Sequence, residues 1–186
     1  DEHVPDWDSL TDAQKADWDD KMAVYAAMVD RMDQNIGRIR QALKETGEDK
    51  NTLIMFLSDN GASSEYTRGR GFLPEINAAN EKPASDPTSF TSYGFWGANV
   101  SNTPMRLFKH WEYEGGTATP FIAYCPAIIK KHFQTNRPAH LIDRMATGLD
   151  AAGVSYPKTY KGNTIKPTEG ISLLPMMEGK AWSGHK

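Results

Sequence analysis

The chain has 186 residues, 39% of them hydrophobic and 10% aromatic, and its formal net charge is −3. The near balance of charge and the lack of any apolar run approaching roughly 20 residues argue against a nucleic-acid partner and a membrane partner. A single cysteine, Cys125, excludes a disulfide framework and a cysteine-rich zinc site, while the apolar content suffices for a packed core.

The first regular pattern along the chain is helical. Residues 12–17 are compatible with a short helix, and a much clearer one follows. Its apolar residues recur at alternating spacings of three and four on one stripe: Met22, Tyr25, Val29, Met32, Ile36, Ile39 and Leu43. This spacing predicts an amphipathic helix of about six turns, with Gly47 as its C-cap.

Two apolar runs predict strands. Residues 52–58 are apolar without alternation, which is typical of a strand covered on both faces and indicates an interior strand of a largely parallel sheet. Residues 119–125 predict a second strand, in which Cys125 is expected to be a buried, inert thiol. Helix, turn and strand in this order predict an α/β fold.

The remaining segments are less regular. Residues 62–98 are rich in Gly, Ser, Pro and Asn and predict a long loop, which is either a binding loop or lid or a disordered insertion. Residues 140–152 predict an amphipathic helix closed by Gly153, and residues 154–186 predict an extended tail. The face of that helix expected to point inward consists of Leu141, Ile142, Met145, Leu149 and Ala152.

Asp59 and Asn60 directly follow the first predicted strand. Ligands of α/β sheets collect at the carboxyl ends of strands, so this pair is a candidate cation site. A carboxylate beside an amide oxygen suits Ca²⁺, or Mg²⁺, better than zinc. The alternative is a plain turn, since Asn-Gly is a common turn dipeptide. Ca²⁺ prefers roughly six to eight oxygens, so further ligands would have to come from elsewhere.

A second candidate cluster spans residues 101–110 and is followed by Glu114, Gly115 and Gly116. Arg106 and Lys109 are three residues apart and would share a face if this segment were helical. Together they could clamp an anionic group, the first as a fork and the second as a point charge. The alternative is a solvated basic patch on a loop.

Read together, these segments resemble the type I sulfatases, in particular the bacterial arylsulfatases. The resemblance rests on four stretches in the same order: residues 25–37 with 51–61, residues 102–109 with 114–122, residues 140–153, and residues 170–175. It implies an alkaline-phosphatase-like α/β sandwich that hydrolyses sulfate esters of small molecules or glycans. It also implies a periplasmic or secreted enzyme.

The resemblance assigns roles to three residues. Asp59 and Asn60 match the later Asp-Asn pair that holds the Ca²⁺ of the family, and Lys109 matches the lysine that contacts the sulfate. The family's nucleophile is a formylglycine, made from a Cys or Ser within a C/S-x-P-x-R motif. That motif and the family's early Asp-Asp pair are missing from this sequence.

These departures predict that residues 1–186 are the later portion of a sulfatase catalytic domain. The nucleophile and the remaining metal ligands are then expected upstream, in a part of the same domain that would be the chain's structural partner. Two alternatives stay open. One is a phosphodiesterase or phosphonate hydrolase of the same superfamily, and the other is a non-catalytic module that binds a cation or an anion.

Overall fold

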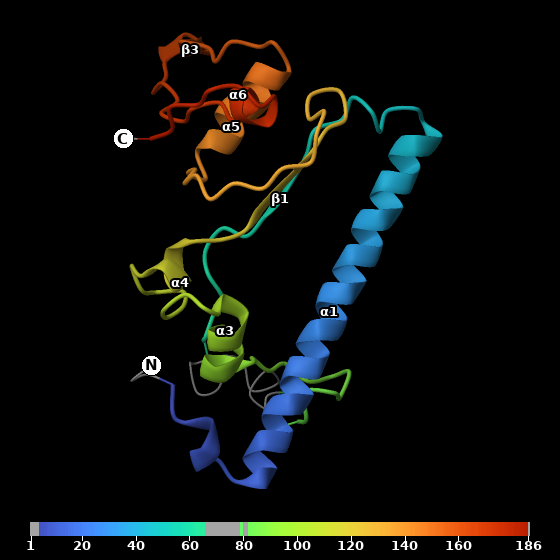
Figure 1. The fold of residues 1–186 in the computed structure, drawn as a ribbon, viewed down its shortest axis with the longest axis vertical. Coiled ribbons are helices and arrows are strands. Elements are labelled where there is room, and N and C mark those ends of the chain that lie inside the picture. The colour runs from blue at the N-terminus through green and yellow to red at the C-terminus, as the bar shows by residue number, and fades with distance from the viewer. Residues whose placement is uncertain (1–3, 66–78, 80–81, 186) are drawn as a thin grey trace. The chain divides into compact units, whose positions relative to one another are not determined.

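The computed structural model describes residues 4–65, 79 and 82–185 (Figure 1). The chain divides into two compact units. Unit 1 comprises Asp1–Ile39 and Leu57–Pro120, and unit 2 comprises Arg40–Phe56 and Phe121–Lys186. In chain order the elements are η1 (Trp7–Ser9), α1 (Asp12–Glu45), β1 (Ile54–Leu57), α3 (Gly94–Asn102), α4 (Glu114–Thr117), β2 (Phe121–Tyr124), α5 (Asp143–Ala151), β3 (Thr159–Tyr160), β4 (Asn163–Thr164) and α6 (Leu174–Met177).

Helix α1 is continuous over 34 residues and joins the two helical stretches predicted from the sequence (Figure 1). It begins with a reciprocal cap: the Thr11 N–H donates to Gln14 Oε1 (2.9 Å) and the Gln14 N–H donates to Thr11 Oγ1 (3.3 Å). Its end is closed by Gly47, whose φ of +77° is the left-handed conformation typical of a C-cap. The predicted helix and its C-cap are therefore confirmed.

The apolar stripe of α1 is mostly exposed to solvent in the described part of the chain. Met32 is 43% exposed and Ile39 is 61% exposed. Among the described residues of the helix, Trp18 is the one that is buried. In unit 1 the helix packs through aromatic pairs, with ring centroids 4.8 Å apart for Trp18 and Trp96 and 4.7 Å for Tyr25 and Tyr93. No helix among the described residues has an apolar stretch long enough to cross a membrane.

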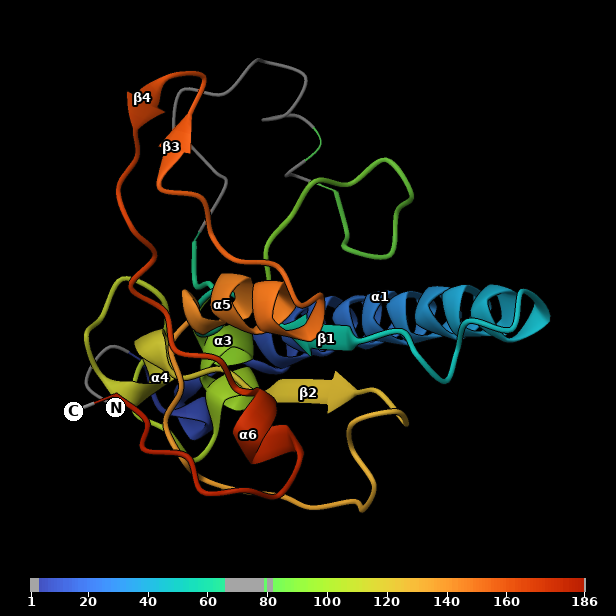
Figure 2. The same cartoon turned by 90° about the horizontal axis from the view of Figure 1, so that it is seen from above.

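Strands β1 and β2 pair in a two-stranded sheet and confirm the central residues of both predicted strands. Strands β3 and β4 form a separate antiparallel hairpin, in which Thr159 lies opposite Thr164 (Figure 2). Because each sheet of the described residues has two strands, the largely parallel sheet and the interior position of residues 52–58 are not confirmed and stay predictions. Cys125 is buried, as predicted.

Two irregular segments contain more structure than predicted. Helix α3 occupies the last five residues of the predicted loop 62–98, of which residues 66–78, 80 and 81 lie outside the described residues. The predicted extended tail, 154–186, contains β3, β4 and α6. It also supplies Leu173, Met177 and Trp182, whose buried side chains form the core of unit 2.

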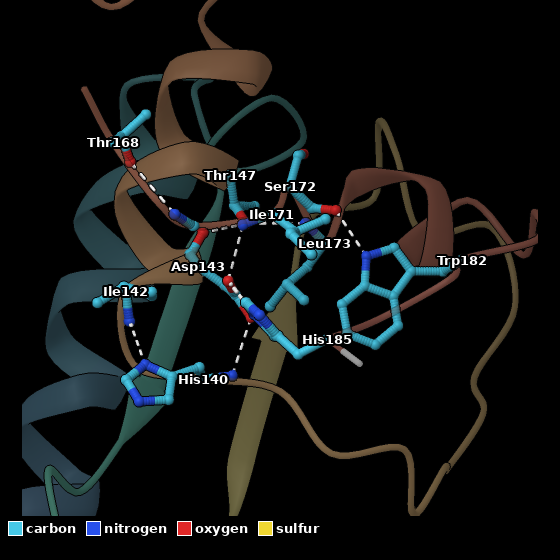
Figure 3. A network of polar contacts seen from close by, with 11 residues as sticks. His140, Ile142, Asp143, Thr147, Thr168, Ile171, Ser172, Leu173, Trp182 and His185 are labelled. Atoms are coloured by element: carbon cyan, nitrogen blue, oxygen red, sulfur yellow. Dashed lines mark hydrogen bonds and ion pairs between the residues drawn. The ribbon is translucent and has the colours of Figure 1, made fainter.

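The inward face predicted for residues 140–152 is wrong. Helix α5 forms, but Met145 is 59% exposed, and the buried residues of the helix are Asp143 and Thr147. Figure 3 shows the reason: both polar side chains bind the tail. Thr147 Oγ1 accepts the Leu173 N–H at 2.9 Å. A polar face can be buried when its hydrogen bonds are satisfied in this way.

Asp143 is the centre of this network (Figure 3). Its carboxylate accepts hydrogen bonds from the backbone N–H groups of His140 and Ile171, both at 2.8 Å, and lies 2.8 Å from His185 Nε2. Burial raises the pKa of Asp143, but these donors outweigh it, so that the pKa lies below its ordinary value. The hydrogen bonds of this carboxylate thus hold residues 170–185 against α5.

Candidate functional site

The structure places Asp59 and Asn60 immediately after β1, in a bend of unit 1. Asp59 is exposed and Asn60 is half-buried. The Asn60 Nδ2 group donates to the carbonyl of Gly61 at 2.8 Å, so Oδ1 is the atom of this amide that could face a cation. The pair therefore lies in a bend, and a common direction of its two side-chain oxygens towards a cation stays a prediction.

Three glycines hold this bend against the loop that carries Lys109. The Gly61 N–H donates to the carbonyl of Gly116 at 3.0 Å, and the Gly115 N–H donates to the backbone carbonyl of Arg106 at 2.9 Å. A Cβ on Gly61 would lie 1.8 Å from the Gly115 oxygen, and a Cβ on Gly115 would lie 1.9 Å from the Leu107 oxygen. Only glycine permits this close approach of two backbones.

Replacing Gly61 by alanine is expected to separate these backbones and to lower the free energy of unfolding of unit 1 by about 1–3 kcal/mol. Thermal or urea unfolding of the variant measures this loss. The control is Gly37→Ala, because a Cβ there meets no atom within 4 Å. Equal stability of the two variants would show that the segments are not packed as described.

Asn102, the last residue of α3, connects the same segments through its side chain. Its Nδ2 group donates to the carbonyls of Leu107 (2.9 Å) and Gly115 (2.6 Å), and its Oδ1 accepts the Ala62 N–H (3.1 Å). One half-buried amide thus makes hydrogen bonds to three backbone groups from different parts of unit 1. It fixes the bend after β1 relative to residues 107–115.

Lys109 lies on the segment that this arrangement positions. Its backbone N–H donates to the carbonyl of Ala62 at 2.8 Å, two residues after Asn60. Its ammonium nitrogen lies 3.9 Å from Glu65 Oε2, and the neighbouring His110 Nε2 lies 2.9 Å from Glu65 Oε1. The structure therefore brings the backbones of the two predicted site segments together. A position of the Lys109 ammonium beside the Asp59 carboxylate stays a prediction.

The helical segment that would give Arg106 and Lys109 a shared face does not form, and the clamp of an anion by the two side chains stays untested. Residues 103–110 form turns, bends and irregular backbone, so the two side chains share no helical face. The Arg106 guanidinium lies 4.4 Å from the ring centroid of Tyr113 instead, where a cation–π contact stabilises it. Lys109 is the residue of this segment to which the family resemblance assigns the contact with the sulfate.

Sequence reasoning missed Glu65 and His110. Glu65 follows the Asp59-Asn60 pair by a few residues, and His110 directly follows Lys109, so their closeness to both candidate segments was the available signal. His110 also has a φ of +88°, a left-handed conformation that costs a non-glycine residue free energy and that is common at functional sites. With its neighbours as far as Tyr113 it lines a shallow hollow of about 500 Å³.

The side-chain oxygens of the bend are of the type that a hard cation prefers, but they are too few to complete its coordination shell. Asp59 and Asn60 offer a carboxylate and an amide oxygen, which suit Ca²⁺ or Mg²⁺. Within the described residues, no three His, Cys, Asp or Glu side chains are grouped so that they could hold a metal ion. Any cation here would need additional ligands from elsewhere.

The sulfatase family model matches residues 3–154, which is most of the chain. The chain belongs to the sulfatase family. The resemblance to type I sulfatases inferred from the sequence is thereby confirmed, and the family implies an alkaline-phosphatase-like α/β fold.

Individual sulfatases match nearly the whole chain. An arylsulfatase of Klebsiella aerogenes is 33% identical over 180 residues, covering 94% of this chain and 39% of that protein. An uncharacterized sulfatase of Schizosaccharomyces pombe is 32% identical, covering 96% of this chain and 32% of its own length. An N-acetylgalactosamine-6-sulfatase of Mus musculus is 28% identical over 153 residues. The chain therefore spans less than half the length of these relatives.

Proposed function

We propose that the protein to which this chain belongs is a sulfuric ester hydrolase. It hydrolyses the sulfate ester of a small molecule or glycan to an alcohol or phenol and inorganic sulfate. The proposal rests on one observation in a member of the sulfatase family: backbone hydrogen bonds hold the two candidate site segments side by side. The Lys109 N–H donates to the carbonyl of Ala62, and the Gly61 N–H donates to the carbonyl of Gly116.

In this proposal Asp59 and Asn60 contribute two oxygens to a Ca²⁺ site, for which Mg²⁺ is the second option. The cation, when bound, polarises the sulfate oxygens as a Lewis acid. Lys109 donates hydrogen bonds to a sulfate oxygen and neutralises charge that develops there during ester cleavage. The Asn102 amide and the glycine contacts hold both segments in place before the substrate arrives.

The nucleophile of the proposed reaction is a formylglycine outside these 186 residues, since the sequence has no C/S-x-P-x-R motif. The same proposal places it in an upstream part of the catalytic domain, and the enzyme in the periplasm or outside the cell. The names of the relatives include an arylsulfatase and a sulfatase of a sugar, which supports both aryl and carbohydrate sulfates as substrates.

We expect the 186-residue chain alone to show no sulfatase turnover, because covalent catalysis requires the nucleophile. The test compares the purified chain with a version extended upstream, co-expressed with a formylglycine-generating enzyme. Both are assayed with an aryl sulfate and Ca²⁺. Only the extended protein is expected to release the phenol.

The other outcomes each select an alternative. Turnover by the 186-residue chain would contradict the placement of the nucleophile. Cleavage of phosphodiesters or phosphonates by the extended protein, without cleavage of the aryl sulfate, would indicate the rival hydrolase class. Inactivity of both proteins towards all of these esters would indicate a non-catalytic binding module.

A further inference from the structure

We propose that Glu65 is a positioning residue for the sulfate-binding end of the site. Its carboxylate links the Lys109 ammonium and the His110 imidazole into one cluster. The inference rests on the proposed function, because it takes Lys109 as the side chain that contacts the sulfate.

Each oxygen of the Glu65 carboxylate lies near one partner among the described residues. Oε1 lies 2.9 Å from His110 Nε2, and Oε2 lies 3.9 Å from Lys109 Nζ. An ammonium group has three N–H donors, so a contact with Glu65 on one side leaves donors for a sulfate oxygen on another. The lysine can therefore lie between its structural carboxylate and the anionic substrate.

A backbone hydrogen bond supports the ion pair between Glu65 and Lys109. Lys109 is tied to the segment of Glu65 through its backbone as well, by the 2.8 Å hydrogen bond to Ala62. That segment directly continues the Asp59-Asn60 bend. Glu65 therefore fixes the direction of a long, flexible side chain relative to the candidate cation ligands, and such preorganisation strengthens binding by reducing the ordering cost.

His110 is the second group that Glu65 orients. Its left-handed backbone turns the residue after Lys109, so that the imidazole reaches the same carboxylate. It also lines the hollow that continues to Tyr113. The cluster thus places the His110 imidazole beside the lysine that is proposed to contact the sulfate.

The experiment uses the complete protein with formylglycine installed and compares Glu65→Gln, Glu65→Asp and the control Glu178→Gln. Glu178 makes an exposed ion pair with Lys180 (2.6 Å) in unit 2. The readouts are KM and kcat for an aryl sulfate, the Ca²⁺ concentration for half-maximal activity, the thermal midpoint, and binding of inorganic sulfate by calorimetry.

For Glu65→Gln we expect a KM and a sulfate dissociation constant raised about 5- to 30-fold, an unchanged Ca²⁺ requirement, and partial rescue in Glu65→Asp. Glu178→Gln should match the wild type. Unchanged sulfate affinity in Glu65→Gln would overturn the inference, and so would a raised Ca²⁺ requirement, which would make Glu65 a metal ligand.

The measurement of sulfate binding distinguishes a failure of this inference from a failure of the proposed function. If the wild type binds sulfate but does not turn over the ester, the proposed function fails, and the ratio of the two dissociation constants still decides the role of Glu65. If the wild type binds no sulfate, the inference is overturned as well.

Discussion

The kcat/KM of the complete enzyme for an aryl sulfate is expected to fall about 10²- to 10³-fold when Lys109 is replaced by alanine. The removed ammonium is the proposed donor to the sulfate oxygens, where negative charge increases as the ester bond breaks. Its backbone is already held by the hydrogen bond to Ala62, so the substitution removes the charge without releasing the segment.

A matched control is Lys166→Ala, because Lys166 forms an ion pair with Glu169 (2.9 Å) and its side chain is 83% exposed. Exposed pairs of this kind contribute little, so this variant should keep the wild-type activity. Lys109→Arg should recover only part of the loss, since a guanidinium fork cannot replace a compact ammonium at the same place. Wild-type activity in Lys109→Ala would remove this residue from the site.

The elements that the sequence predicts well are those controlled by neighbouring residues. The period of α1 follows from spacings of three and four, and its C-terminal end follows from Gly47. The two strands follow from unbroken apolar runs. The sheet to which they belong requires partners far away in the sequence, which a local pattern does not identify.

The error on α5 has a different cause. A periodic apolar face predicts the buried side only if apolar residues are the ones that become buried. Here both polar side chains are buried because they bind backbone N–H groups far along the chain. Asp143 binds Ile171, 28 residues away, and Thr147 binds Leu173, 26 residues away. The stabilising partners come from the tail, and nothing in the helix sequence itself indicates them.

The candidate site was predicted through family resemblance and only in part. Asp59, Asn60 and Lys109 lie in recognisable stretches, whereas the structural role of Asn102 and the proposed role of Glu65 depend on tertiary contacts. Asn102 reaches Ala62 across 40 residues, and Glu65 reaches His110 across 45. Side chains that hold other parts of a site in place become visible only when the chain is folded.

Replacing Asp143 by alanine is expected to lower the free energy of unfolding of unit 2 by about 1–3 kcal/mol, since the half-buried hydrogen bonds from the backbone N–H groups of His140 and Ile171 lose their charged acceptor. The Asp143 residue has no exposed surface, and His185 loses its carboxylate partner at the same time. The local measurement is amide hydrogen exchange at His140 and Ile171, which should become faster. The control is Asp150→Ala, which removes one exposed hydrogen bond to Ser172 (2.5 Å) and should cost at most about 1 kcal/mol.

The lowered pKa of Asp143 adds a pH dependence whose sign can be stated in advance. The unfolded chain binds a proton near the ordinary value of about 4, whereas the folded state keeps the carboxylate ionised to lower pH because His140, Ile171 and His185 donate to it. The stabilisation is therefore complete above about pH 4 and is lost as the pH falls through the folded-state pKa.

Asp143→Asn cannot titrate, so the difference in unfolding free energy between wild type and variant should shrink as the pH is lowered from about 5 towards 2. Urea unfolding at a series of pH values measures this difference. A difference that stays constant over that range would show that the folded network does not depend on the charge of Asp143.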